Sequence, residues 1–219
     1  MQELYVRQLK LGPMDNFVYL LGAPGAQETA VVDPAWDFAA ARLAAEEDGR
    51  RITHALLSHH HFDHVNAVPE VLAQGGIRVY AHVLDVPHLS PELQREIKPL
   101  AAGDRVEVGP LPVRALHTPG HTPGSTCWHV EGEAGSLFAG DTVFVGACGR
   151  CDLAGGDPEE MFRSLKRVSE LPAEVKLYPG HDYGEVPVSS IAREREKNPY
   201  FQKLASLTDF VGYRMRPRR

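Results

Sequence analysis

The 219-residue sequence has few cysteines and no excess of positive charge. Its three cysteines, together with an N-terminus that has no basic start followed by an apolar stretch, predict free thiols and a cytoplasmic protein. The formal net charge of −6 argues against nucleic acid as a partner, because a phosphate-binding surface needs a basic excess. No apolar run reaches the ~18 residues that span a bilayer, so we expect no membrane association.

The chain also lacks a low-complexity linker and an internal repeat, so we predict a single domain over residues 1–219 with a short helical segment at about 188–210. Strands and helices are mixed along it, which indicates an α/β or α+β fold. We infer two sheets packed face to face with helices outside, a four-layer αββα sandwich. The strands are predicted at 16–21, 29–32, 52–58, 77–81, 113–116, 125–130, 136–139 and 175–178, and the main helices at 37–48, 65–74 and 157–170.

Histidine is the residue type that stands out, with eleven copies. The segment His59-His60-His61-Phe62-Asp63-His64 directly follows a predicted apolar strand. Alternate residues of an extended segment point the same way, so His59 and His61 can share one metal ion. Asp63 and His64 follow where the chain turns and can face a second ion. Imidazole and carboxylate are ligands that zinc, iron and manganese accept, so this segment predicts a metal site.

Further ligand types stand at the ends of other predicted strands. The segment 117–124 reads HTPGHTPG, Asp141 follows the strand that ends at 139, and His181 follows Tyr178-Pro179-Gly180. Each motif is weak alone, because a single histidine in a loop is usually a surface residue. Recurrence of the same arrangement in one chain predicts that these loops complete the metal site.

The motifs HHHFDH, TPGHT, AGD and PGH, in this order, resemble the ligand series of the metallo-β-lactamase superfamily over about residues 16–199. The resemblance implies a first metal held by His59, His61 and His121 and a second held by Asp63, His64 and His181, with Asp141 as the bridging carboxylate. His117 is assigned a structural role instead. It also implies two divalent ions, zinc first with iron or manganese as alternatives, and a water whose pKa they lower toward ~7. Asp63 would both hold a metal and orient that water.

The stretch GDTVFVGACGRCDLAGGDPEEMFRSL and the later YPGHDYG are similar to two members of this superfamily that handle glutathione derivatives. One is glyoxalase II, a dinuclear thioester hydrolase, and it is the activity we predict. The alternatives are persulfide dioxygenase, whose single iron would need only His59, His121 and Asp141, and a lactone hydrolase. The resemblance suggests Arg150 and Tyr183 as contacts to a thioester or glutathione-derived substrate. A homodimer built on the short C-terminus is a further expectation.

Other interpretations carry less weight. Secreted zinc β-lactamases commonly have Cys where this chain has Asp141, and a purely structural zinc site would have no surplus ligands. The pair Cys148 and Cys151 could be a redox pair or half of a zinc site, but the chain has no second C-x-x-C motif. We therefore interpret residues 148–151 as a simple loop.

Overall fold

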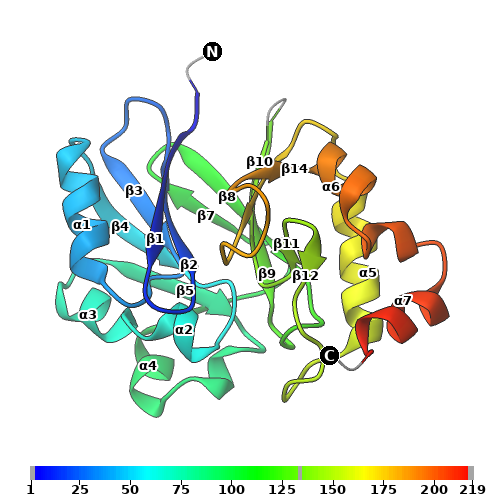
Figure 1. Cartoon of the computed structure of the whole chain (residues 1–219). Coiled ribbons are helices and arrows are strands. Elements are labelled where there is room, and N and C mark those ends of the chain that lie inside the picture. The colour runs from blue at the N-terminus through cyan, green and yellow to red at the C-terminus, as the bar shows by residue number, and fades with distance from the viewer. Residues whose placement is uncertain (1–2, 133–134, 217–219) are drawn as a thin grey trace.

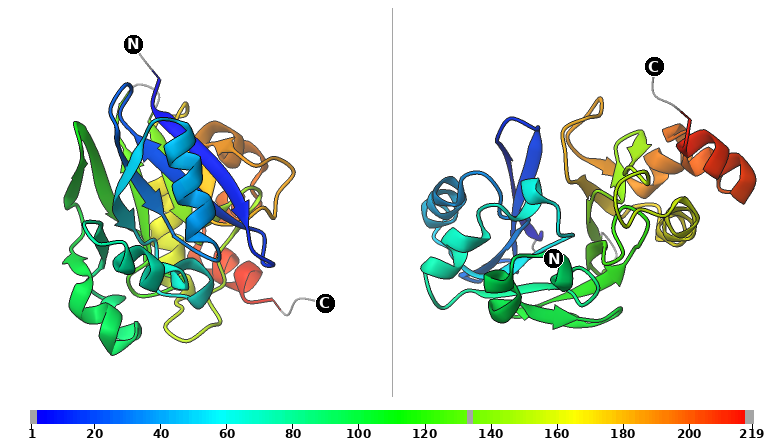
Figure 2. Two further views of the ribbon diagram at one scale, coloured as in Figure 1. Left: turned by 90° about the vertical axis from the view of Figure 1, so that its left-hand side faces the viewer. Right: turned by 90° about the horizontal axis from the view of Figure 1, so that it is seen from below.

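The computed structural model describes residues 3–132 and 135–216. Two six-stranded sheets face each other, and helices cover the outer face of each (Figures 1 and 2). This arrangement confirms the predicted αββα sandwich. Within the described residues, no helix combines the length and apolar character that a membrane crossing requires.

The first sheet has its strands in the same order in space as in sequence. Its first three strands are antiparallel, and β3 to β6 run parallel. The strands are β1 (Tyr5–Leu11), β2 (Asn16–Gly22), β3 (Glu28–Val32), β4 (Arg51–Leu56), β5 (Arg78–His82) and β6 (Lys98–Leu100). The accompanying helices are α1 (Phe38–Glu47), α2 (Phe62–Val65), α3 (Val68–Ala73), η1 (Val86–His88) and α4 (Pro91–Glu96).

The second sheet has the order β14-β13-β10-β9-β8-β7. Its strands are β7 (Arg105–Val108), β8 (Leu111–His117), β9 (Thr126–Val130), β10 (Ser136–Gly140), β13 (Lys176–Pro179) and β14 (Ser189–Ser190). A small hairpin of β11 (Val143–Phe144) and β12 (Ala147–Cys148) stands beside it. The helices on its outer side are α5 (Pro158–Ser169), α6 (Ile191–Lys197), η2 (Phe201–Lys203) and α7 (Leu207–Arg214).

Three buried clusters hold the four layers together. On β2, Leu20 packs under the helices of the first sheet, whereas Tyr19 and Leu21 point into the space between the sheets. On β10, Phe138 joins the central cluster, and Leu137 packs against α5 on the other side. Successive side chains of a strand point to opposite faces, so strands that are apolar on both faces form the middle of a sandwich.

Two predicted elements differ from the structure. The helix expected at 65–74 is two short helices, α2 and α3, because Pro69 lacks an N–H and its ring would clash with the carbonyl of Val65 in a continuous helix. The helical segment expected at about 188–210 begins at Ile191 and continues to Arg214, and it is interrupted near Pro199 as predicted.

The structure adds strands that were not predicted, β1 and β7 among them. The α5 N-cap is as expected, with Asp157 accepting from the N–H of Glu159 and Glu160.

Strand direction explains why the predicted ligands lie together. β3 and β4 are parallel neighbours, and so are β10 and β13. The carboxyl ends of parallel strands meet at one edge of a sheet, where the loops that follow them can build a site. The loops after β4, β10 and β13 carry, respectively, the histidine-rich segment, Asp141 and His181.

Candidate metal centre

The first group of candidate ligands consists of His59, His61 and His121. One ligand nitrogen from each lies within 4.8 Å of the other two. His59 and His61 come from the loop after β4, and His121 comes from the loop between β8 and β9. His59 and His121 are both 2 % exposed, and the ring of His61 stands nearly perpendicular to that of His121 at 4.6 Å. Three converging imidazoles form a ligand set suited to zinc or iron.

The second group consists of Asp63, His64 and His181, whose ligand atoms also lie within 4.8 Å of one another. Asp63 Oδ2 is 3.4 Å from His64 Nε2 and 3.3 Å from His181 Nε2. The two Nε2 atoms are 3.1 Å apart. The Asn16 side chain holds the carboxylate in place by donating to Asp63 Oδ2 at 3.0 Å and to its backbone carbonyl at 2.9 Å.

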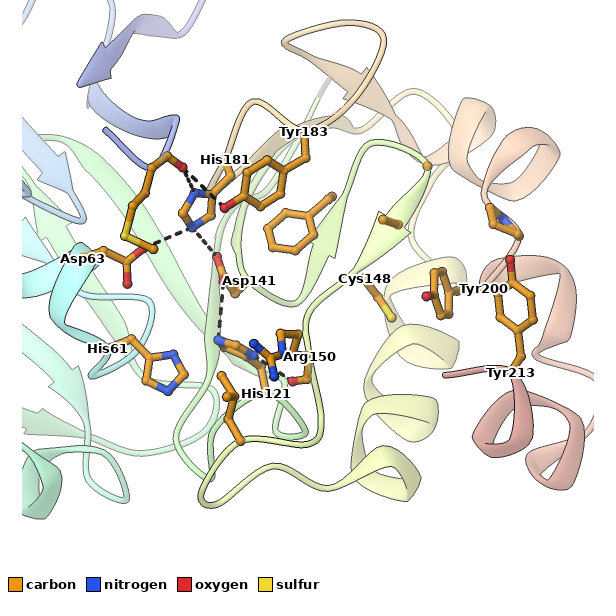
Figure 3. A pocket seen from close by; sticks show the side chains of 16 residues that line it. His61, Asp63, His121, Asp141, Cys148, Arg150, His181, Tyr183, Tyr200 and Tyr213 are labelled. Carbon is orange, nitrogen blue, oxygen red and sulfur yellow. Dashed lines mark hydrogen bonds and ion pairs between the residues drawn. The ribbon is translucent and has the colours of Figure 1, made fainter. Parts of the chain in front are cut away.

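Asp141 lies between the two groups. Its Oδ2 is 3.3 Å from His121 Nε2, and its Oδ1 is 3.4 Å from His181 Nε2 (Figure 3). The same Oδ1 is 3.3 Å from His64 Nε2. Each carboxylate oxygen therefore faces a different group. This is the position that a bridging ligand needs.

Hydrogen bonds to the other ring nitrogen orient four of the histidines. Nδ1 of His121 contacts the Arg150 carbonyl at 2.8 Å, and Nδ1 of His181 contacts the Met14 carbonyl at 2.9 Å. A carbonyl only accepts, so each Nδ1 carries the proton and each Nε2 keeps its lone pair. His64 Nδ1 meets Asp33 Oδ2 at 3.0 Å with the same consequence.

His59 is oriented through a hydroxyl. Ser58 Oγ donates to Asp33 Oδ2 at 2.6 Å, so the hydroxyl can only accept from His59 Nδ1 at 2.9 Å. When the imidazoles are neutral, all four Nε2 atoms therefore present lone pairs toward the space between the groups. Partners on the second nitrogen of this kind are usual for metal-bound histidine.

The buried polar atoms show that the site is suited to cations. Among the residues described, Nε2 of His59, Nε2 of His121 and Oδ1 of Asp141 are buried without a hydrogen-bond partner. Unsatisfied buried acceptors are costly, and the Nε2 atoms of His64 and His181, 3.1 Å apart, avoid lone-pair repulsion only when a proton or a metal ion lies at one of them. A positive ion at each group removes both penalties, so the residues fit two metal ions.

The pKa shifts differ between the groups. Burial, followed by the neighbouring histidines, lowers the pKa of His61 to about 4 and that of His59 well below its usual value. Both imidazoles are thus neutral at neutral pH, which is the form that binds metal. Burial also lowers the pKa of His64, but the carboxylates of Asp141 and Asp33 outweigh it and raise that pKa well above the usual value. The second group therefore attracts a proton or a metal ion strongly.

The sequence interpretation missed Asp33, which is 2 % exposed and lies at the end of β3. Its Oδ1 accepts from the Ser58 N–H at 2.6 Å, and its Oδ2 contacts Ser58 Oγ and His64. Asp33 has φ +50°, a conformation that Asp tolerates better than most residues. The pattern Val-Val-Asp-Pro, an acid at the end of an apolar strand, could have identified it, since Asp141 was found on the same signal.

Asp85 was also missed, and it connects the two loops that carry the first group. It accepts from the His60 N–H at 3.0 Å, from Thr122 Oγ1 at 2.8 Å and from the Gly124 N–H at 2.6 Å. It is 1 % exposed. A Cβ on Gly124 would lie 2.6 Å from Asp85 Oδ1, so only glycine permits this approach. No sequence signal around Asp85 pointed to this role, because all three of its partners are distant in sequence.

A pocket of about 740 Å³ opens from the ligand groups toward α7 and contains the predicted substrate contacts (Figure 3). Tyr183 is 54 % exposed, and its ring is stacked on His181 with centroids 4.6 Å apart. Arg150 is exposed and forms two hydrogen bonds to Asp152, each 2.9 Å long. Tyr200 and Tyr213 form the far wall. Both predicted contact residues therefore line the pocket that contains the ligands.

The remaining motif residues lie outside the ligand groups. His117 Nε2 donates a hydrogen bond to the Pro123 carbonyl at 2.8 Å, and its ring stacks on His82 with centroids 3.9 Å apart, which agrees with a structural role. Cys148 and Cys151 are buried, and no disulfide joins them to each other or to another described residue. Burial raises the pKa of Cys151 to about 11, so this thiol is unreactive at neutral pH.

Comparison with known proteins agrees with this geometry. The family model of the metallo-beta-lactamase superfamily matches residues 11–181. A hydroxyacylglutathione hydrolase from Fuscovulum blasticum is 40 % identical over 77 % of this chain. The chain spans 63 % of that relative's length. A probable polyketide biosynthesis zinc-dependent hydrolase, PksB, from Bacillus subtilis is 32 % identical over 92 % of this chain and 88 % of its own length.

Among solved structures, ETHE1 from Myxococcus xanthus superposes with a TM-score of 0.84 at 30 % identity. The superposition covers 98 % of this chain and 92 % of that one. The similarity thus extends through the C-terminal helices α6 and α7, beyond the residues that the family model matches.

Proposed function

The chain belongs to the metallo-β-lactamase superfamily, and on that premise we propose that it is a metal-dependent thioester hydrolase of the glyoxalase II type. The observation that carries this proposal is the pair of ligand groups with Asp141 facing both. Two divalent ions there would lower the pKa of a water toward ~7 and polarise a thioester carbonyl. Zinc is the metal we propose first, since PksB is named as zinc-dependent.

The side chains of the site would have three roles: metal binding, orientation of the attacking water and contact with the substrate. His59, His61 and His121 would hold one ion, and His64 and His181 would hold the other with Asp63. Asp141 would be the ligand that the two groups share, since its two carboxylate oxygens face different groups. Asp63, kept in place by Asn16, would also accept a hydrogen bond from the attacking water and orient it. Arg150 and Tyr183 would contact the substrate from the wall of the pocket.

The dinuclear arrangement suits hydrolysis because it needs no serine or cysteine nucleophile. Cys148 lies in the same pocket but is 1 % exposed, and Cys151 has a raised pKa. A thioester carbonyl placed between the ligand groups would meet a water from one side. Its sulfur substituent would point into the 740 Å³ pocket.

A second candidate is persulfide dioxygenase, which the likeness to ETHE1 over nearly the whole chain supports. That reaction would use one iron held by His59, His121 and Asp141. These residues are a subset of the seven proposed ligands, so the side chains alone are compatible with both reactions.

Metal analysis of protein purified without added metal separates the two candidates. About two zinc ions per chain, with hydrolysis of S-lactoylglutathione or of a simple acyl thioester, is the result we expect. One iron per chain, with oxygen consumption on glutathione persulfide and no thioester hydrolysis, would overturn the proposal in favour of the dioxygenase.

A further inference from the structure

A second concavity adjoins the metal centre on the side away from Tyr200 and Tyr213. It is a groove of about 450 Å³ that runs between α2, α3 and α4. His61 lines both this groove and the main pocket, so the two cavities meet at a proposed metal ligand. In Figure 3, His61 stands across the ligand groups from the two tyrosines.

Apolar side chains line the groove together with five polar residues, His60, His61, Asn66, His88 and Ser90. Val65, Leu89 and Leu93 form the floor, and each is buried in the cluster beneath the first sheet. Phe62 forms a wall and is 71 % exposed, although it is a large apolar side chain. Its ring packs edge-on against Trp36, with centroids 6.1 Å apart. In the described part of the chain, neither an acid nor a lysine or arginine lines this groove.

An exposed, fixed phenylalanine beside a catalytic centre indicates an apolar ligand, because covering that ring removes apolar surface from water. The ring lies next in sequence to His61 and Asp63, which belong to the two ligand groups. Since His61 lines both cavities, an apolar chain that leaves the centre past His61 would enter the groove that Phe62 lines.

The shape of a thioester requires two exits from the metal centre. The acyl chain and the sulfur substituent leave the trigonal carbonyl carbon in different directions. The main pocket, with its tyrosines and Arg150, is the wider and more polar exit and suits the thiol half. The groove beyond His61 is the second exit.

We propose that this groove binds the acyl chain, and that the natural substrates are thioesters of apolar acyl groups several carbons long. This inference rests on the proposed thioester hydrolysis and adds its acyl specificity. Phe62, Val65, Leu89 and Leu93 are the specificity-determining residues.

Chain length provides the test. We would measure kcat/KM for the acetyl, butyryl, hexanoyl and octanoyl thioesters of one thiol, N-acetylcysteamine, with the metal-loaded protein. Each methylene that becomes buried should raise kcat/KM, by up to about fourfold. Hexanoyl should exceed acetyl by about tenfold or more. Equal values along the series, or a decline, would overturn the inference and leave thioester hydrolysis intact, whereas no turnover of any thioester would overturn both.

Variants locate the effect in the groove. Phe62→Ser removes the exposed wall, and Val65→Phe fills the floor, so each should lower the ratio of hexanoyl to acetyl kcat/KM by about fivefold or more. Leu43→Ser is the matched control, because Leu43 is 56 % exposed on α1, outside both cavities. It should leave the ratio unchanged. A ratio unchanged in Phe62→Ser would contradict the assignment even if Val65→Phe failed to fold.

Direct binding supplies a readout that does not depend on turnover. Trp36 is one of two tryptophans and contacts Phe62, while the other, Trp128, is fully buried. Octanoate should change tryptophan emission at lower concentration than acetate, and Phe62→Ser should abolish that difference. Association of a second copy through the groove would appear instead as a concentration-dependent dimer that Phe62→Ser dissociates, with no dependence on chain length, and would overturn the inference.

Discussion

The two ligand groups of the metal centre are built from different chemistry. The first has three imidazoles, whose pKa values burial and mutual repulsion lower. The second combines a carboxylate with two imidazoles, and carboxylates raise the pKa of its His64. Because the first group has only neutral imidazoles, Asp141 would be the only carboxylate to balance the charge of an ion bound there. An ion at the second group would have Asp63 as well as Asp141. The two candidate ligand groups are therefore electrostatically distinct, although both contact Asp141, at 3.3 Å from His121 and from His64 and at 3.4 Å from His181.

Their supporting contacts differ as well. Within the described residues, the Asp85 carboxylate hydrogen-bonds only to the loops of the first group. Asp33 contacts His64 directly and His59 through Ser58. A substitution of Asp33 should therefore weaken the second group and, in part, the first, whereas a substitution of Asp85 should weaken the first group alone. Variants at these two positions test whether the groups are independent.

Removal of one ligand from each group should have the largest effect. His64→Ala and His61→Ala should each lose about one metal per chain, and thioester hydrolysis should fall at least about a thousandfold, because a dinuclear site loses several kcal/mol of transition-state stabilisation. Metal analysis and kcat/KM on the same samples provide the measurement. Substantial activity in His64→Ala would count against a dinuclear hydrolase.

Asp33→Asn should weaken metal binding about 10- to 100-fold at the second group, because the amide can donate to His64 Nδ1 and favour the wrong tautomer. Asparagine tolerates the positive φ at this position, so the backbone should be retained. Titration of metal-free protein with zinc, followed by calorimetry, would report both sites. Equal weakening of both sites would show that Ser58 transmits the change fully to His59.

Asp85→Asn should weaken only the first group, by about tenfold, since its contacts run to His60, Thr122 and Gly124. The same zinc titration should leave the affinity of the second group within error of the unaltered protein. Glu131→Gln is a suitable control, because Glu131 is an exposed acid paired with Arg105 and Arg114 away from the site. A loss at the second group in Asp85→Asn would show that the groups are not separable.

The smallest effect we expect is that of acid on the free energy of unfolding, through His54, which lies outside the ligand groups. Burial, followed by the charge of Arg78, lowers the pKa of His54 to about 4 from its usual 6.5. The unfolded chain then binds more protons than the folded one between these values, so the free energy of unfolding falls as the pH drops from about 6.5 to 4. His54→Gln should flatten this slope in metal-free protein, as measured by urea unfolding at several pH values. An unchanged slope would mean that other groups set the acid sensitivity.

The sequence alone determined the family, the layers and the seven proposed ligands. Each ligand follows an apolar strand, as His, Asp or Pro-Gly-His. A ligand in such a position can be recognised from the few residues around it, without knowledge of its partners in the fold. The C-terminal helices were predicted with their break at Pro199, for which the missing N–H of proline is sufficient reason. The prediction of one continuous helix at 65–74 was wrong, because Pro69 cannot continue a helix that includes Val65.

Tertiary structure decided what supports and surrounds those ligands. Asp33 meets His64 across 31 residues and Asp85 meets Gly124 across 39, and no local pattern encodes such pairings. The groove beside His61 likewise forms only where α2, α3 and α4 pack together. Ligand identity follows from residue type and strand position, whereas tautomer, pKa and the paths open to substrate depend on which distant side chains the fold brings within hydrogen-bonding distance.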